Sequence, residues 1–246
     1  MKSHAAPPQG ASPVGADAGA TPLRADSLRA IIFDMDGLML DTERLATPAW
    51  QDAKDAIGVD FDMSLLDAMI GRNYQDCRAL IVERHGEAFP TDRLMEAWHV
   101  AYDAIVERDG VAIKHGLLPL LDWLEEMRVP KAVATSTRRA RAMTKLANAG
   151  LATRFDAIVG GDEISRGKPA PDIFLLAAAR LAAAPSSCVV LEDSAPGVRA
   201  AIAAGMTPIM VPDLLAAPPD IVGSATLVLP SLEHVHAHLR ALPRMG

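Results

Sequence analysis

Short apolar runs alternate with amphipathic stretches through the second half of the chain, and this alternation constrains the fold most. Each run is three or four residues long and is expected to form a strand; the runs lie at 131–134, 157–159, 189–191, 208–211 and, more weakly, 226–229. The stretches between them repeat apolar residues at helical spacing, at 117–127, 139–149, 173–183 and 198–204. Strands that alternate with helices predict an α/β fold with a doubly wound parallel sheet. An earlier apolar run at 30–33, stopped by Asp34-Met-Asp-Gly, predicts a further buried strand.

The stretch from 43 to 111 has a different pattern. Apolar residues recur every three or four positions, glycines and prolines interrupt the pattern, and no convincing strand occurs. We therefore expect an inserted helical bundle at 43–112 and a core made of 28–42 and 113–246. Residues 1–27 are rich in Ala, Pro and Gly without a continuous apolar segment, which predicts a disordered tail and not a secretory signal.

The composition indicates which partners and which cellular environment the protein is expected to have. The formal net charge is −7, so a nucleic-acid partner is not expected, and an anionic substrate would need a local basic pocket. No apolar stretch reaches the length of a membrane helix. The two cysteines, Cys77 and Cys188, are expected to be unpaired thiols in a reducing environment. We expect a soluble cytoplasmic protein, and a monomer.

Polar side chains follow the predicted strands at the points where they end. Ligands of open α/β sheets bind at the carboxyl ends of the strands, and here those positions hold Asp34, Asp36, Thr135, Glu192 and Asp193, with Lys168 in a nearby loop. One Asp after a strand is usually a turn residue or a helix cap. Four carboxylates that converge repel one another unless a cation lies between them. Oxygen ligands favour a hard ion, Mg²⁺ before Mn²⁺ or Ca²⁺.

The spacing of Asp34 and Asp36 suits phosphoryl transfer. In an extended segment, residues i and i+2 point to the same side. One carboxylate can then attack phosphorus while the other handles the proton of the leaving group. The Thr135 hydroxyl and the Lys168 ammonium can bind the oxygens of the transferred group.

These residues, in this order, resemble the haloacid dehalogenase-like hydrolase superfamily, within it the branch of β-phosphoglucomutase and many small-metabolite phosphatases. The motifs are Asp34-Met-Asp-Gly-Leu-Met-Leu-Asp41-Thr42, Thr135, Lys168-Pro-Ala-Pro-Asp172 and Glu192-Asp193-Ser194. The resemblance extends from Leu28 nearly to the C-terminus. It implies a Rossmann-like core with a helical cap inserted just after the first motif.

The resemblance also implies a role for each matching residue. Asp34 is the nucleophile and a Mg²⁺ ligand, and Asp36 is the acid/base whose backbone carbonyl binds the metal. Thr135 and Lys168 hold the phosphoryl group. Asp193 is a metal ligand, with Glu192 beside it binding directly or through water.

The acceptor of the phosphoryl group separates a phosphatase from a mutase. Asp36 argues against a dehalogenase, which lacks an acid/base at this place. β-Phosphoglucomutases carry a His shortly after the first motif and a cap Lys, and these positions match Ala46 and Trp98 here. The differences favour a Mg²⁺-dependent phosphatase acting on a small phosphorylated metabolite, with a sugar phosphate mutase as the alternative.

Three further residues are candidates for substrate binding. Arg72 and Asn73 lie in a cap loop, and Arg138 lies at a helix start after Thr137, where free N–H groups favour anions. The histidines at 234, 236 and 238 follow a helical pattern without a nearby carboxylate, so packing is expected there and not metal binding. Low aromatic content in the cap weakly disfavours a substrate with a stacked base.

A receiver domain of a response regulator also gathers carboxylates, a hydroxyl and a Lys around Mg²⁺. Such a signalling domain has no helical insertion after the phospho-acceptor strand and no acid/base two residues beyond it. A non-catalytic protein on this fold is the remaining alternative, and the complete set of expected catalytic side chains argues against it. The identity of the substrate stays open.

Overall fold

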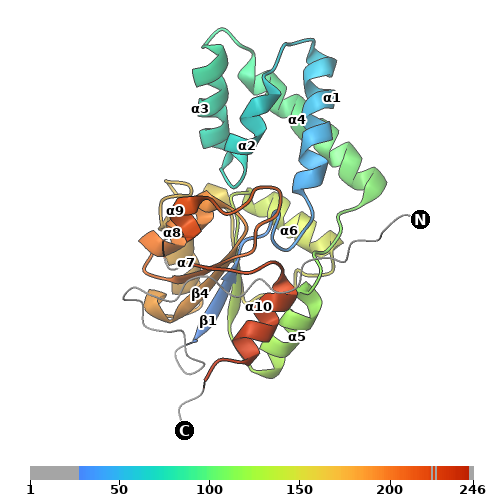
Figure 1. Ribbon diagram of the computed structural model, residues 1–246. Coiled ribbons are helices and arrows are strands. Elements are labelled where there is room, and N and C mark those ends of the chain that lie inside the picture. Colours follow the sequence, from blue (N-terminus) through green and yellow to red (C-terminus); the bar gives the residue numbers. More distant parts are fainter. Residues whose placement is uncertain (1–27, 223, 225, 244–246) are drawn as a thin grey trace, which may run out of the picture.

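The computed structural model describes residues 28–222, 224 and 226–243. The predicted tail at 1–27 lies outside the described residues. A six-stranded parallel sheet forms the centre of the molecule, in the order β3-β2-β1-β4-β5-β6 (Figure 1). Its strands are β1 (Ala30–Phe33), β2 (Lys131–Ala134), β3 (Ala157–Val159), β4 (Cys188–Glu192), β5 (Thr207–Met210) and β6 (Leu227–Val228). This is the doubly wound order, and it confirms the predicted Rossmann-like sheet.

Both faces of the sheet are covered because alternate residues of each strand enter different cores. Ile31 and Phe33 join the cluster formed with helices α5 (Leu117–Glu126), α6 (Arg139–Asn148) and α10 (Leu232–Arg240). Ala30 and Ile32 join the cluster with α7 (Asp172–Arg180) and α8 (Ala195–Ala203). A short helix α9 (Pro219–Val222) lies near the edge strands. Strands that are apolar on both faces are typical of a parallel sheet between two helical layers.

Two helices begin or end at other residues than predicted, because a side-chain cap or the local backbone conformation sets their ends. Helix α8 begins three residues earlier than expected because the Ser194 side chain accepts the N–H of Gly197 and caps it. Helix α7 ends at Arg180 instead of 183, and Ala182 beyond it has a left-handed backbone with φ 51°.

The inserted helices form a cap that has its own hydrophobic clusters. They are α1 (Glu43–Ile57), α2 (Leu66–Met69), α3 (Tyr74–His85) and α4 (Thr91–Asp109), with a 3₁₀ turn at Met63–Leu65. In Figure 1 the cap stands over one end of the sheet, and α1 and α4 run side by side. Six of the chain's aromatic residues lie in it: Trp50, Phe61, Tyr74, Phe89, Trp98 and Tyr102. Within the described ranges, no helix has both the length and the apolar character required to cross a bilayer.

Candidate active site

The carboxyl ends of β1, β2 and β4 bring the predicted residues together. Phe33 is in register with Val133 and with Leu191, so the side chains that follow the three strands meet at one edge of the sheet. Five residues here are at most 6 % exposed: the strand-end residues Asp34, Thr135, Glu192 and Asp193, and Lys168 from the loop after β3. The sequence-predicted cluster is therefore one buried site beneath the cap.

Lys168 bridges two carboxylates at the bottom of the site. Its ammonium donates to Asp34 Oδ1 at 2.5 Å and also to Glu192 Oε1. Glu192 Oε2 accepts the backbone N–H and the hydroxyl of Ser194, both at 2.9 Å. Burial opposes the charge on Lys168, but the two carboxylates outweigh it and raise its pKa. Both oxygens of Glu192 are thus occupied within the protein, and its visible role is to hold Lys168.

Negative charge exceeds positive charge around Asp34. Burial raises the pKa of Asp34 to about 8, with Lys168 lowering it and Glu192 adding to the rise. Burial also raises the pKa of Asp193 well above its ordinary value, and the charges of Glu192 and Asp34 add to the effect. Three buried carboxylates share the one ammonium of Lys168, which is an arrangement that a further cation would stabilise.

Asp36 has a different environment from Asp34. Its Oδ2 accepts the hydroxyls of Thr137 at 2.7 Å and Thr135 at 3.2 Å, and its Oδ1 accepts the ammonium of Lys145 at 2.6 Å. Burial raises the pKa of Asp36, but Lys145 and the hydrogen bonds outweigh burial, and the net shift is downward. Neighbouring aspartates with pKa values shifted in opposite directions are typical of a site that divides nucleophile and acid/base between them.

Sequence reasoning missed Lys145 and Thr137. Thr137 lies two residues beyond Thr135 in the same turn. Lys145 lies on the buried side of α6, near Ala142 and Leu146. A charged residue at apolar helical spacing was the available signal for Lys145.

The backbone of the first motif lies very close to the side chain of Asp193. Gly37 has φ +83°, and a Cβ at this position would lie 2.3 Å from Oδ2 of Asp193. Only glycine fits both the left-handed conformation and the contact. The loop after β1 is therefore held directly against the Asp193 carboxylate.

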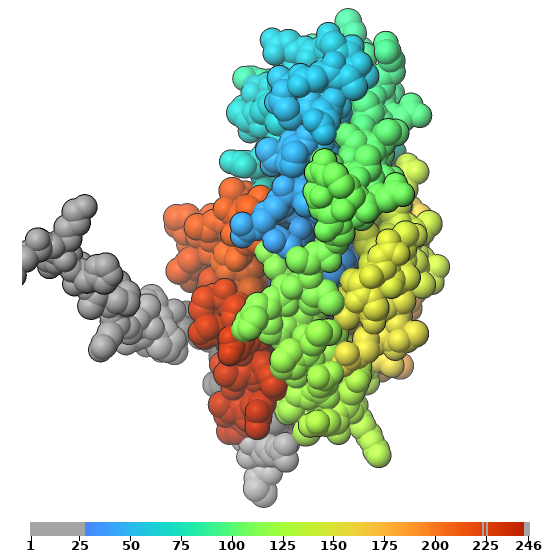
Figure 2. Space-filling view, turned by 90° about the vertical axis from the view of Figure 1, so that its right-hand side faces the viewer, coloured from blue at the N-terminus to red at the C-terminus, as the bar shows by residue number. Residues whose placement is uncertain are grey.

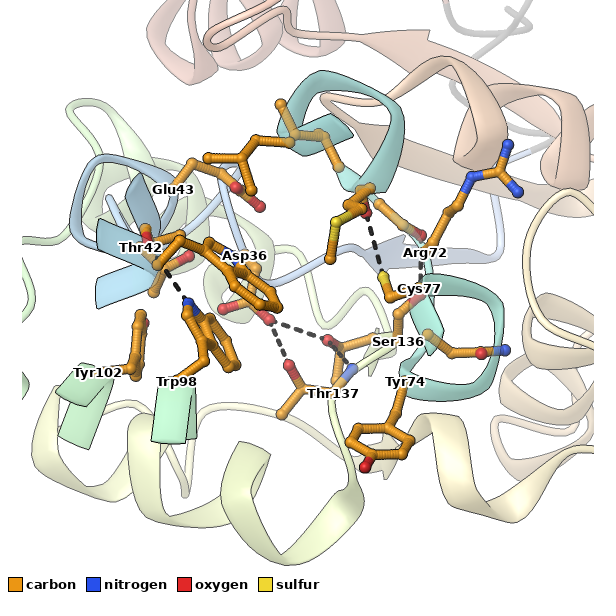
Figure 3. Close-up of a pocket in the computed structure, with 18 of the residues that line it drawn as sticks. Asp36, Thr42, Glu43, Arg72, Tyr74, Cys77, Trp98, Tyr102, Ser136 and Thr137 are labelled. Carbon is orange, nitrogen blue, oxygen red and sulfur yellow. Dashed lines mark hydrogen bonds between the residues drawn. The ribbon is translucent and has the colours of Figure 1, made fainter. Parts of the chain in front are cut away.

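A cavity of about 210 Å³ opens from Asp34 and Asp36 toward the cap (Figure 3). In this view Trp98 and Tyr102 lie on one side of Asp36, while Arg72 and Tyr74 lie on the other. Trp50 also lines the cavity and stacks on Trp98 with ring centres 5.2 Å apart. The premise of low aromatic content in the cap was wrong, because six of the chain's ten aromatic residues lie there; the expectation against a stacked base stays a prediction.

The cap is closed on the core through several contacts. The Ser136 hydroxyl donates to the carbonyl of Gly71 at 2.9 Å, and Arg141 on α6 forms an ion pair with Asp103 on α4. Figure 2 shows the green surface of α4 lying against the yellow surface of α6. Gly71 has φ +76°, and a Cβ there would lie 2.5 Å from the Ser194 hydroxyl. Cap and core therefore enclose the cavity between them.

The three predicted substrate-binding residues all line this cavity. Arg72 Nε donates to the carbonyl of Ala68 at 2.8 Å. Asn73 caps α3 by accepting the N–H of Asp76 at 2.9 Å, so a structural role is visible for it. The Arg138 guanidinium lies over the ring of Tyr74, 5.3 Å from its centre, and has no carboxylate partner among the described residues. Arg72 likewise forms no ion pair among the described residues, so both guanidinium groups are available to an anion.

The histidines of α10 do not form a shared site. His234 Nδ1 lies 2.8 Å from the Ser231 hydroxyl, and the ring of His236 packs near Trp123 at 5.5 Å. Over the described ranges, no three His, Cys, Asp or Glu side chains converge as a ready-made metal cage. A metal at the active site would therefore have to take part of its ligands from the backbone or from water.

Comparison with known proteins identifies the family of the chain. The profile of the haloacid dehalogenase-like hydrolases matches residues 28–205. The chain is 36 % identical over 179 residues to fructose-1-phosphate phosphatase YqaB of Escherichia coli (strain K12), covering 72 % of this chain and 92 % of that protein. It is 33 % identical over 184 residues to a phosphorylated carbohydrates phosphatase of Thermotoga maritima, covering 73 % and 82 %.

Solved structures agree with this placement. The structure of CbbY from Rhodobacter sphaeroides in complex with phosphate is 28 % identical, with a TM-score of 0.73, and covers 85 % of this chain and 96 % of that one. The motifs, the sheet order and the inserted cap agree with the same family. The chain belongs to the haloacid dehalogenase-like hydrolase family and is an enzyme of its capped, β-phosphoglucomutase-like branch.

Proposed function

We propose that this enzyme is a Mg²⁺-dependent phosphatase that hydrolyses a small phosphorylated metabolite through an aspartyl phosphate on Asp34. The observation that carries the proposal is the contrast between Asp34, paired with Lys168, and Asp36, held by Lys145 and two threonines. In this proposal the Asp34 carboxylate attacks phosphorus, and the Asp36 carboxyl group transfers the proton. The phosphatases among the relatives support the reaction class.

The residues present fit a Mg²⁺ ion. Asp34 and Asp193 supply hard carboxylate oxygens, and burial with mutual repulsion raises the pKa of both. Gly37 holds the backbone of the first loop against Asp193, next to the Asp36 carbonyl. We assign Asp34, Asp193 and that carbonyl as ligands, with Glu192 acting through Lys168 or a water molecule. When bound, the ion would neutralise charge on the phosphoryl oxygens.

The first half-reaction follows from the positions of Asp34 and Asp36. The Asp34 carboxylate attacks phosphorus, and the bond from phosphorus to the ester oxygen breaks. Lys168 and the Thr135 hydroxyl bind the phosphoryl oxygens as charge shifts onto them. The negative charge of a bound phosphate raises the proton affinity of Asp36, which takes up a proton on substrate binding and gives that proton to the leaving oxygen.

The second half-reaction frees Asp34 and puts a proton back on Asp36, which loses it again when phosphate leaves. Asp36, now a carboxylate, takes a proton from water, and the resulting hydroxide attacks phosphorus. The acyl phosphate bond breaks, which releases inorganic phosphate and the Asp34 carboxylate. The closed cap limits the entry of bulk water during transfer.

The decisive experiment is release of inorganic phosphate from a panel of phosphorylated metabolites with Mg²⁺, with EDTA and with the Asp34→Asn variant as controls. Release that needs both Mg²⁺ and Asp34 supports the proposal. Formation of glucose-6-phosphate from β-glucose-1-phosphate and glucose-1,6-bisphosphate, without phosphate release, would make the enzyme a mutase. Trp98 favours hydrolysis in this proposal, because it stands at the position that the sequence matches to the cap Lys of a mutase, and its indole N–H donates to the carbonyl of Ala46 at 3.3 Å.

A further inference from the structure

A second cavity reaches the active site from another side. Its volume is about 370 Å³, and it lies between the α2 segment of the cap and the loop after β5, next to the start of α8 (Figure 1). Asp34 lines the first cavity, whereas Asp193 lines the second one. The two carboxylates assigned to the metal therefore face different spaces.

The second cavity runs from an exposed rim to a buried floor. Asp67 from the cap and Leu214 and Leu215 from the core lie at the rim, where the two leucines are 46 % and 40 % exposed. Asp193 and Ser194 lie at the floor and are 6 % and 5 % exposed. The cavity thus connects the surface of the molecule with a buried carboxylate of the active site.

The cap loop at Gly71 separates the two cavities. Gly71 lines the first cavity and Ser194 lines the second, and a Cβ on Gly71 would lie 2.5 Å from the Ser194 hydroxyl. The Gly71 carbonyl also accepts the Ser136 hydroxyl of the core at 2.9 Å. In the closed protein the loop is therefore pressed onto the core between the two spaces. Closure over the first cavity leaves the rim of the second one at the surface.

The size and lining of the second cavity suit a hydrated cation. One water molecule needs about 10–15 Å³ of such space, so the cavity has room for an ion that keeps several waters, as Mg²⁺ does. Asp67, Glu43 and Asp193 contribute carboxyl groups to the lining. Arg72 is the single Lys or Arg among the described lining residues. The acidic lining favours a cation over a phosphate ester.

We propose that the second cavity is a port through which Mg²⁺ and its water molecules reach Asp193 while the cap is closed on the substrate. The port rests on the proposed function, which assigns Asp193 as a metal ligand. It adds that the metal and the substrate enter by separate routes. A port changes the rates of metal binding and release and leaves Kd unchanged, because the bound and free states stay the same.

The first test locks the cap and follows Mn²⁺, which accepts the same oxygen ligands as Mg²⁺. Asp103→Cys on α4 and Arg141→Cys on α6 replace an ion pair between cap and core and are joined with a short bismaleimide. Cys77 and Cys188 are buried, and the two single variants treated with the same reagent are the controls. Stopped-flow release of Mn²⁺ into an excess of a chelating dye should keep its rate within about twofold of the unlinked protein.

The second test narrows the rim. Ala216 is exposed and lines the second cavity, so Ala216→Trp places a bulky side chain there. We expect association and dissociation of Mn²⁺ both to slow at least about tenfold, with Kd unchanged. Ala88→Trp adds the same side chain at an exposed turn of the cap outside both linings and should leave the rates as in the wild type.

Two outcomes would overturn the port. One is Mn²⁺ release that stops when the cap is linked, because the metal would then leave only through an open cap. The other is Mn²⁺ exchange that Ala216→Trp does not slow. A protein that exchanges Mn²⁺ as expected but releases no phosphate from any ester of the panel would instead contradict the proposed function and support the port. Failure to bind Mn²⁺ at all would contradict the metal assignment and the port together.

Discussion

The ammonium of Lys145 lies 2.6 Å from the carboxylate of Asp36, on the side away from the two threonine hydroxyls that the carboxylate also accepts. A core helix thereby holds the proposed acid/base in position and keeps it ionised in the absence of substrate.

Replacing Lys145 should therefore change the pKa of Asp36 as well as the rate. In Lys145→Met, loss of the positive charge leaves burial dominant, and we expect the pKa of Asp36 to rise. The value of kcat should fall about 10- to 100-fold because Asp36 loses an anchor. Carboxylate NMR titration and steady-state kinetics measure the two effects. Arg139→Met removes a half-exposed cation from the same helix and is the control; an equal effect there would refute the specific role of Lys145.

Lys168 should matter for stability as well as for activity. Lys168→Met leaves Asp34 and Glu192 buried without a counter-charge, so the free energy of unfolding should fall by about 3–5 kcal/mol in EDTA. Urea denaturation measures the change. In the exposed ion pair of Arg199 and Asp220, Arg199→Met should change the free energy of unfolding far less than Lys168→Met does. Similar losses in the two variants would show that the buried pair is not special.

Gly71 should control closure of the cap. Gly71→Ala introduces a Cβ that would lie 2.5 Å from the Ser194 hydroxyl, at a backbone φ of +76°. Gly58 has a similar φ of +69° with no atom within 4 Å, so Gly58→Ala carries the backbone strain alone. We expect kcat/KM to fall at least about tenfold in Gly71→Ala and little in Gly58→Ala. Equal losses would assign the effect to backbone strain instead of cap closure.

Glu43 should make the metal-free protein less stable as the pH rises. Burial first, and then the charge of Asp36, raises the pKa of Glu43 from 4.5 to about 7. Between these values the folded state binds a proton that the unfolded state has lost, so stability falls with rising pH by at most about 1.4 kcal/mol per pH unit. Glu43→Gln should flatten this part of the profile. Denaturation at pH 5, 6 and 7 in EDTA measures the slope, and an unchanged slope would contradict the shift.

The fold and half of the site could be predicted because their signals are local. Each strand is a short apolar run that ends in a polar residue, and parallel strands end at the same edge, so Asp34, Thr135 and Asp193 had to meet. Glu192 was expected at the metal, but its oxygens are taken by Lys168 and Ser194.

The rest of the site depends on how the cap packs against the core. Tyr102 and Lys145 are distant in sequence, and each lies in a helix whose pattern alone indicates packing. Their meeting beside Asp36 requires α4 to lie over α6, which the Arg141 and Asp103 ion pair fixes. No local sequence pattern predicts how the two helices pack against each other.

The central claim is that Asp34 carries the phosphoryl group, and chemical trapping tests it most directly. The enzyme is mixed with Mg²⁺ and acetyl phosphate, quenched in acid within the first turnovers, and reduced with borohydride, which converts an acyl phosphate into an alcohol. Mass spectrometry should find homoserine at position 34, and none without acetyl phosphate or in the Asp34→Asn variant. Continued phosphate release with an unmodified Asp34, or with the modification at another residue, would contradict the account.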